Sequence, residues 1–186
     1  MNSRLQIFSG RFRGRKLFLP PDARPTQNRA RMALFNILGG LIGADENIVV
    51  WDAFAGSGAF GIECLSRYPG ARVYFTDVAT TSVQTVRKNL AMLQVGNVAV
   101  VEQIDANMAV KRIGGVADLI FVDAPYDDAD VGFTFVRALG KRAKNGAILI
   151  WEQETSHSVN PPHGWEILRD KVYGRARFLI LQRCGE

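Results

Sequence analysis

The chain has 186 residues, 47% of them hydrophobic, and a net charge of +5 at neutral pH. This length suits one compact domain with a core of its own. Cys64 and Cys184 are far apart in sequence, which excludes a disulfide scaffold and a cysteine metal site. No apolar run approaches the length of a signal peptide or a membrane span, which excludes a membrane protein. We expect a cytoplasmic protein with reduced cysteines.

Positive charge is concentrated at the N-terminus. Residues 1–31 hold eight Lys and Arg against the single acid Asp22, a net of +7, which leaves −2 for the rest of the chain. Two extended pieces, 5–8 and 16–19, flank an arginine-rich stretch and predict a basic hairpin. A polyanion would suit such an arm because each neutralised phosphate releases counterions. Charge alone fits a solvated surface equally well.

A helix is expected after the prolines at 20, 21 and 25. Thr26 is placed to cap it, Gly39-Gly40 to end it, and its apolar face comprises Met32, Leu34, Phe35, Ile37 and Leu38. We expect residues 1–40 to form an appendage of hairpin and helix on a main domain of residues 41–186.

From residue 47 onward, short β-branched runs alternate with helical patterns. The expected strands are 48–52, 72–76, 98–102, 117–123 and 147–152, and the expected helices are about 58–67, 79–94, 105–112 and 129–143. This alternation predicts a parallel α/β sheet with helices on both faces and ligands at the carboxyl ends of the strands. Near the end, 165–169 and 177–181 flank a turn at 172–175 and predict a hairpin, so the last strand is antiparallel.

The loop after the first expected strand contains Gly56, Gly58 and Gly61 in the spacing G-x-G-x-x-G, followed by a helix. Glycines let a backbone approach a ligand closely, and the helix start offers free amides. The acid Asp52 just before the loop would repel the pyrophosphate of a dinucleotide. It favours S-adenosylmethionine, which carries an ammonium and a sulfonium.

Two further acids end the next two strands. Asp77 is placed to accept the ribose hydroxyls of such a cofactor, and Asp105 to accept from its adenine amine. The alternative for both is that they simply cap the helices that follow. The complete set of expected cofactor residues is Asp52, Ala55, Gly56, Ser57, Gly58, Asp77, Val78, Asp105 and Ala106.

The fourth strand ends in Asp123-Ala124-Pro125-Tyr126. An exocyclic amine on a base is a poor nucleophile because its lone pair is delocalised. The Asp123 carboxylate and a loop carbonyl are placed to accept its hydrogens and to stabilise developing charge, while Pro125 restricts the loop and Tyr126 stacks on an extruded base. A strand end with a buried tyrosine would look the same in isolation. His157 and His163 have no cysteine near them, so we expect no metal.

The chain resembles the bacterial ribosomal RNA guanine-N2 methyltransferases of the RsmD type, which act on 16S RNA. The resemblance is carried by residues 9–17, Arg24-Pro25-Thr26, residues 33–36, the segment 52–67 and the acceptor loop. It implies a class I S-adenosylmethionine-dependent methyltransferase fold, Rossmann-like, with seven strands of which the last is antiparallel. It also implies catalysis at Asp123, Pro125 and Tyr126 in a monomer acting on ribosomal RNA. The implied RNA contacts are Arg11, Arg13, Arg15, Lys16, Arg24, Thr26, Arg29 and Arg31.

Three positions depart from the family pattern. Ala124 replaces a second proline, Asn28 an acid and Met32 a glutamate. The first bears on the rate of transfer and the other two on the nucleotide that is chosen. Two alternatives stay open: a DNA adenine or cytosine amino-methyltransferase, and a non-catalytic RNA-binding assembly factor.

Overall fold

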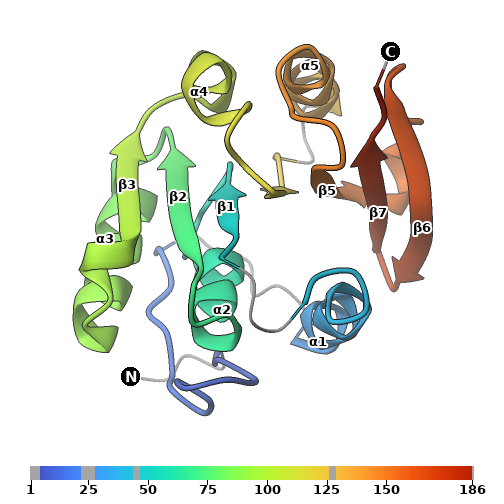
Figure 1. Ribbon diagram of the computed structural model, residues 1–186. Coiled ribbons are helices and arrows are strands. Elements are labelled where there is room, and N and C mark those ends of the chain that lie inside the picture. The colour runs from blue at the N-terminus through green and yellow to red at the C-terminus, as the bar shows by residue number, and fades with distance from the viewer. Residues whose placement is uncertain (1–4, 22–27, 44–46, 126–128, 186) are drawn as a thin grey trace.

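The computed structural model describes residues 5–21, 28–43, 47–125 and 129–185. Within them, seven strands form one sheet in the order β3-β2-β1-β4-β5-β7-β6, with helices above and below it (Figure 1). Strands β1 to β5 run parallel, and β7 lies antiparallel between β5 and β6. The predicted Rossmann-like α/β sheet with an antiparallel last strand is confirmed.

The elements lie within a few residues of the predicted ones. The strands are β1 Val49–Asp52, β2 Arg72–Asp77, β3 Ala99–Gln103, β4 Leu119–Val122, β5 Ile148–Glu154, β6 Trp165–Tyr173 and β7 Ala176–Arg183. The helices are α1 Asn28–Leu38, α2 Ala59–Arg67, α3 Thr80–Leu93, α4 Ala106–Ile113 and α5 Ala129–Gly140, with short 3-10 turns at Gly96–Val98 and Thr155–His157. The final hairpin is longer than predicted. Gly174, at a φ of 62°, confines its turn to two residues, so Val172 and Tyr173 belong to β6.

Both faces of the sheet are buried. Val50, Phe121 and Ile150 face one core, which the N-terminal segment, α1, α2 and α3 cover. The neighbouring residues Trp51 and Ile120 face a second core under α4 and α5. This two-sided burial explains why the parallel strands read as nearly continuous apolar runs.

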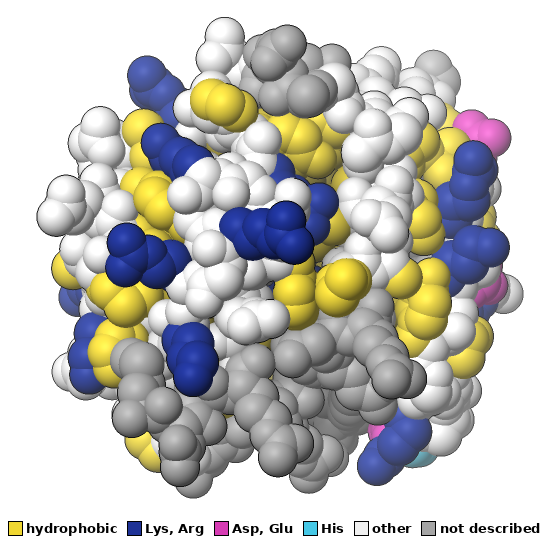
Figure 2. Space-filling model, turned by 90° about the horizontal axis from the view of Figure 1, so that it is seen from below, with side chains coloured by type: hydrophobic (Ala, Val, Ile, Leu, Met, Phe, Trp, Pro, Cys, Tyr) yellow, Lys and Arg dark blue, Asp and Glu magenta, His cyan; other side chains and the backbone are white. Residues whose placement is uncertain are grey.

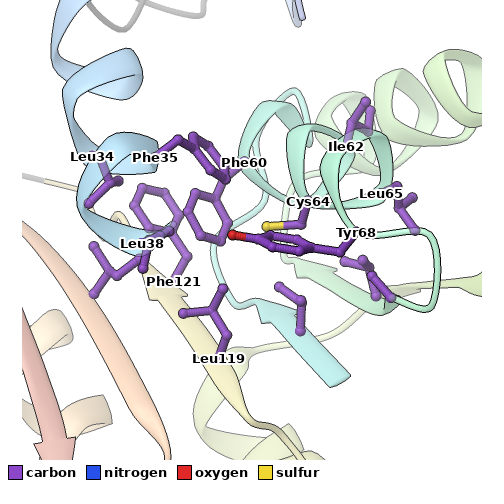
Figure 3. Packing of buried hydrophobic residues seen from close by; sticks show 14 of the residues in the cluster. Leu34, Phe35, Leu38, Phe60, Ile62, Cys64, Leu65, Tyr68, Leu119 and Phe121 are labelled. Carbon is purple, nitrogen blue, oxygen red and sulfur yellow. The ribbon is translucent and has the colours of Figure 1, made fainter. Parts of the chain in front are cut away.

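Aromatic stacking docks α1 onto the sheet. The Phe35 ring of α1 stacks on the Phe60 ring of α2 with centroids 5.2 Å apart, and Phe60 stacks on Phe121 of β4 at 4.2 Å. Figure 3 shows Leu34 and Leu38 of α1 beside this stack. The appendage therefore shares one core with the sheet. Its separate role, with a division near residue 40, stays a prediction.

The arm, residues 5–21, pairs with itself only loosely. An isolated antiparallel bridge joins Gln6 and Lys16, and the Ile7 amide donates to the Arg15 carbonyl at 3.0 Å. The predicted hairpin is present as a pairing, but its described residues form no regular strands. The reason is that many backbone groups of the arm bond to α2 and α3 instead of to each other.

Two side chains of α2 attach the arm. The fully buried Glu63 carboxylate accepts hydrogen bonds from the amides of Phe8 at 2.9 Å and Ser9 at 3.0 Å, and pairs with Arg67 at 2.8 Å. The Ser66 hydroxyl accepts from the Phe12 amide at 3.0 Å and donates to the Ser9 carbonyl at 2.5 Å. A buried carboxylate is tolerated only when paired and hydrogen-bonded, so Glu63 fixes the position of the arm.

No helix in the described part of the chain has the length and apolar character that a bilayer crossing requires. Among the same residues there is no cluster of three or more His, Cys, Asp or Glu suited to a metal ion. Cys64 and Cys184 are free thiols.

Candidate active site

The glycines after β1 serve different purposes. Gly56 has a φ of 53°, and a Cβ added there would meet nothing within 4 Å, so the backbone lies open to a ligand. A Cβ on Gly58, at a φ of 75°, would lie 3.1 Å from Val86 of α3. A Cβ on Gly61 would lie 2.4 Å from the Phe75 ring, so glycine is required for α2 to lie close to β2. This division of roles matches a nucleotide-binding loop.

Asp52 ends β1 beneath this loop. Its carboxylate accepts from the Gly61 amide at 3.0 Å, and the side chain is 1% exposed. Burial raises the pKa of Asp52 to about 7, the Gly61 hydrogen bond opposes the shift, and the nearby charge of Asp77 adds to it. The prediction placed Asp52 directly beside a ligand. The structure shows a buried carboxyl group that orients the start of α2, and a direct contact between Asp52 and the cofactor stays a prediction.

Asp77, at the end of β2, fixes the same loop from the other side. One carboxylate oxygen accepts from the Gly56 amide at 2.8 Å and the other from the Ala79 amide at 2.9 Å. The apolar Val78 next to it is 64% exposed, and the Gln103 side chain holds its carbonyl at 3.1 Å. An open glycine, a carboxylate and an exposed apolar side chain therefore lie together at the carboxyl ends of β1 and β2.

The other expected cofactor residues lie around this edge. The Asp105 carboxylate caps α4 by accepting from the amides of Asn107 at 2.9 Å and Met108 at 3.4 Å, as the helix-cap alternative foresaw. A cofactor contact from Asp105 stays a prediction. Ala106 begins α4 and is buried, Ala55 is buried and donates to the Thr76 carbonyl at 3.0 Å, and the Ser57 carbonyl accepts from Asn89 at 3.0 Å.

The acceptor loop lies next to the glycine loop. Asp52 of β1 pairs in register with Phe121 of β4, and Asp123 follows two residues later on the same face of the sheet. Phe121 pairs with Ile150 of β5, so Glu152 lies level with Asp123 on that face. Asp52, Asp123 and Glu152 thus lie at or near the carboxyl ends of three adjacent strands.

Glu152 and Asp52 both act on Asp123. The pKa of Asp123 is raised well above its ordinary value, first by burial and then by the negative charges of Glu152 and Asp52. Pro125 is exposed beside it and Ala124 is buried. A carboxyl with a raised pKa, at a strand end next to an open loop, is suited to accept a proton. Tyr126 lies outside the described residues.

The predicted basic surface lies on the arm. Arg11, Arg13, Arg15 and Lys16 are all exposed. Figure 2 views the side of the molecule that carries the arm, α1 and α2, and shows Lys and Arg side chains spread across it with few acidic ones. Arg24 and Thr26, and the side chain of Arg29, lie outside the described part.

Arg31 departs from that prediction. It is 5% exposed, its guanidinium lies 4.6 Å from the centroid of the Phe8 ring, and it donates to the Gln6 carbonyl at 2.5 Å. Burial lowers the pKa of Arg31 to about 10, an effect that the charge of Glu63 opposes. In the folded chain Arg31 therefore joins α1 to the arm instead of facing a partner.

Sequence reasoning missed two residues of this region. Glu152 ends its expected strand, so its place beside Asp123 could have been inferred from strand order alone. Asn89, in the middle of α3, bonds to both the arm and the glycine loop. No local sequence signal marks it, because its partners lie 71 and 32 residues away.

Known proteins similar to this chain identify its family. A family model described as conserved hypothetical protein 95 matches residues 5–182. Ribosomal RNA small subunit methyltransferase D of Escherichia coli K12 is 34% identical over 187 residues, covering 98% of this chain and 91% of the relative. The solved structure of putative methyltransferase yhhF from Escherichia coli matches with a TM-score of 0.83 and 30% identity over 98% of this chain and 99% of that one.

A more distant structure supports the fold alone. An RNA methyltransferase from Salinibacter ruber, solved in complex with S-adenosyl-L-homocysteine, matches with a TM-score of 0.66 and 18% identity, covering 88% of this chain and 95% of that one.

Proposed function

The chain belongs to the family described as conserved hypothetical protein 95, the RsmD-type ribosomal RNA methyltransferases, and we propose that it methylates the N2 amine of a guanine in 16S ribosomal RNA. It is an S-adenosyl-L-methionine-dependent methyltransferase that acts on ribosomal RNA. The guanine N2 position, the small-subunit substrate, the monomeric state and the cytoplasmic location belong to the proposal. The observation that supports it is the open glycine loop next to Asp123, a half-buried residue whose carboxyl has a raised pKa.

The residues present fit the cofactor. Space over Gly56 admits a ligand to the backbone, and the Asp77 carboxylate holds the loop around that space. The exposed Val78 offers an apolar surface for a purine ring, and a cation bound above the loop would favour the charged form of the buried Asp52 carboxyl. S-adenosyl-L-methionine, when bound, supplies an electrophilic methyl group.

The acceptor loop would act on the nucleophile. The Asp123 carboxylate accepts a hydrogen from the exocyclic amine, orients its nitrogen and takes up the proton that the amine loses. Its raised pKa makes this carboxylate a stronger proton acceptor than an ordinary aspartate. Pro125 limits the freedom of the loop, and Tyr126 is proposed to stack on the base. Most of the rate gain then comes from alignment of the reacting groups.

We expect purified protein to transfer labelled methyl groups to small ribosomal subunits, or their RNA, from cells that lack this gene. Nuclease digestion and mass spectrometry of the labelled RNA should give N2-methylguanine. Subunits from cells with the gene are the control, because their site is already modified. Label in competitor DNA, or tight RNA binding with no label in any RNA, would favour one of the two alternatives and contradict the proposal.

The exposed arm is proposed to hold the RNA backbone. Replacing Arg11, Arg13 and Arg15 together with glutamine should weaken binding to 16S RNA about tenfold or more. It should also make the slope of log affinity against log salt concentration shallower by roughly 2 to 3, because each lost phosphate contact contributes about 0.7 to 0.9. Filter binding across a salt series measures both.

A control of equal charge uses three exposed residues on the opposite helical layer, Lys111, Arg137 and Arg142. Changing these to glutamine should leave the salt slope close to that of the unmodified protein. Equal loss of slope in both variants would mean that the arm makes no specific contribution.

A further inference from the structure

Asn89 of α3 is a buried amide placed between the arm and the glycine loop. It is fully buried and makes three hydrogen bonds. Its Oδ1 accepts from the Phe18 amide at 2.8 Å, and its Nδ2 donates to the Phe18 carbonyl at 3.1 Å and to the Ser57 carbonyl at 3.0 Å. Both backbone groups of one arm residue and one carbonyl of the cofactor loop thus depend on a single side chain.

Neighbouring residues of α3 strengthen both connections. The Lys88 ammonium lies 3.8 Å from the centroid of the Phe18 ring, so the arm is held by two consecutive residues. A Cβ on Gly58 would lie only 3.1 Å from the Val86 side chain, so Val86 packs closely against that glycine. One turn of α3 therefore contacts both the arm and the glycine loop at Ser57 and Gly58.

The bonds of Asn89 cannot be broken independently at low cost. An asparagine amide has two N–H donors, and both are used in the folded chain. If the Ser57 carbonyl moved away, a buried N–H would be left without a partner, which is unfavourable. Rotating the amide to recover a partner would break its bonds to Phe18. The position of the loop and the position of the arm are therefore linked.

From this geometry we propose that Asn89 is a positioning residue through which RNA binding at the arm and cofactor binding at the glycine loop strengthen each other. The inference rests on the proposed function, which assigns RNA to the arm and the cofactor to the loop. Coupling of this kind is reciprocal: each ligand must raise the affinity for the other by the same factor. It would favour transfer by a protein that holds both partners at once.

The test measures affinities, with S-adenosyl-L-homocysteine and 16S RNA as probes. In the unmodified protein, saturating S-adenosyl-L-homocysteine should tighten RNA binding at least about fivefold, within the usual range of such coupling. In Asn89→Ala this factor should fall close to one, and the affinity for S-adenosyl-L-homocysteine alone should fall several-fold. Calorimetry gives the cofactor affinity, and fluorescence anisotropy gives the RNA affinity.

Ser66→Ala is the matched control. Ser66 is also a buried polar residue of a helix that bonds to the arm, but among the described residues its hydrogen bonds to the N-terminal part are with Ser9, Arg11 and Phe12, and none is with the loop. Ser66→Ala should weaken RNA binding slightly and keep the coupling factor. If Asn89 had a purely structural role, Asn89→Ala would lower the affinities for RNA and for S-adenosyl-L-homocysteine but keep the coupling factor. That result would overturn the proposal.

A second measurement avoids any substitution. Amide exchange of the unmodified protein, followed by NMR, should slow at Phe18 when S-adenosyl-L-homocysteine binds, because its amide bonds to Asn89. Gly14, whose amide bonds within the arm to Ile7, serves as the reference and should change little. Binding of both probes without coupling, or an unchanged rate at Phe18, would refute the inference alone. Failure to bind either probe would refute the proposed function as well.

Discussion

Asp123→Ala should lower kcat/KM for methyl transfer about 10²- to 10³-fold, the usual cost of removing a group that stabilises developing charge. Affinity for 16S RNA should stay within about twofold, because binding rests on many phosphate contacts. Single-turnover assays with labelled donor measure the transfer, and filter binding measures the affinity. Asp123→Asn keeps an oxygen acceptor without the charge, so its kcat/KM should lie between those of the unmodified protein and Asp123→Ala. Full activity in Asp123→Ala would remove this side chain from the mechanism.

The pH profile tests the same carboxyl. The pKa of Asp123 is raised by burial and by the charges of Glu152 on β5 and Asp52 on β1. Since the carboxylate form accepts the proton, kcat/KM should rise with pH through this raised pKa. Glu152→Gln removes one neighbouring charge and should move the rise to lower pH. Glu102 lies on the distant strand β3 and forms an ion pair with Arg112 of α4, so Glu102→Gln should leave the pH profile unchanged. An unmoved profile in Glu152→Gln would contradict the coupling of the two acids.

Asp52→Asn should make the ligand-free protein more stable at pH 8 and have little effect near pH 4. The pKa of Asp52 is about 7 in the folded chain and about 3.8 in the unfolded one, so the folded chain binds this proton more tightly between those values. The free energy of unfolding of the unmodified protein therefore falls as pH rises from about 4 to 7. The gain from the substitution at pH 8 is at most about 4 kcal/mol, from roughly 1.4 kcal/mol per pKa unit.

Urea unfolding at pH 5 and pH 8 checks the sign. Asp170→Asn is the comparison, because a hydrogen bond from Arg177 lowers the pKa of that exposed carboxyl. This hydrogen bond stabilises the folded chain at both pH values, so Asp170→Asn should not raise the free energy of unfolding at pH 8. A loss of stability in Asp52→Asn at pH 8 would mean that the buried charge is better compensated than its surroundings indicate.

The sheet was predictable because its signals are local. Runs such as 119–122 are apolar throughout because both of their faces are buried, and each acid that ends such a run falls at the same edge of a parallel sheet. This was sufficient to bring Asp52, Asp77 and Asp123 together. Glu152 obeys the same rule.

Long-range polar contacts were not predictable. The attachment of the arm depends on Glu63, which bonds to residues 54 and 55 positions away, and on Asn89, 71 positions from Phe18. No periodicity encodes such pairs. Arg31 shows the opposite case: the family resemblance implied an RNA contact there, but in the folded chain Arg31 lies against the ring of Phe8 and donates to the carbonyl of Gln6.

The burial of Glu63 limits how substrate preference can be exchanged between related enzymes. A chimaera that receives a foreign N-terminal segment alone must again place two backbone amides over the Glu63 carboxylate, where those of Phe8 and Ser9 lie here, or leave a buried charge without these partners. Transplants should therefore carry the inward side of α2, at least Glu63 and Ser66, together with residues 5–21. The arm and α2 therefore form one exchangeable unit, although they are separated in the sequence.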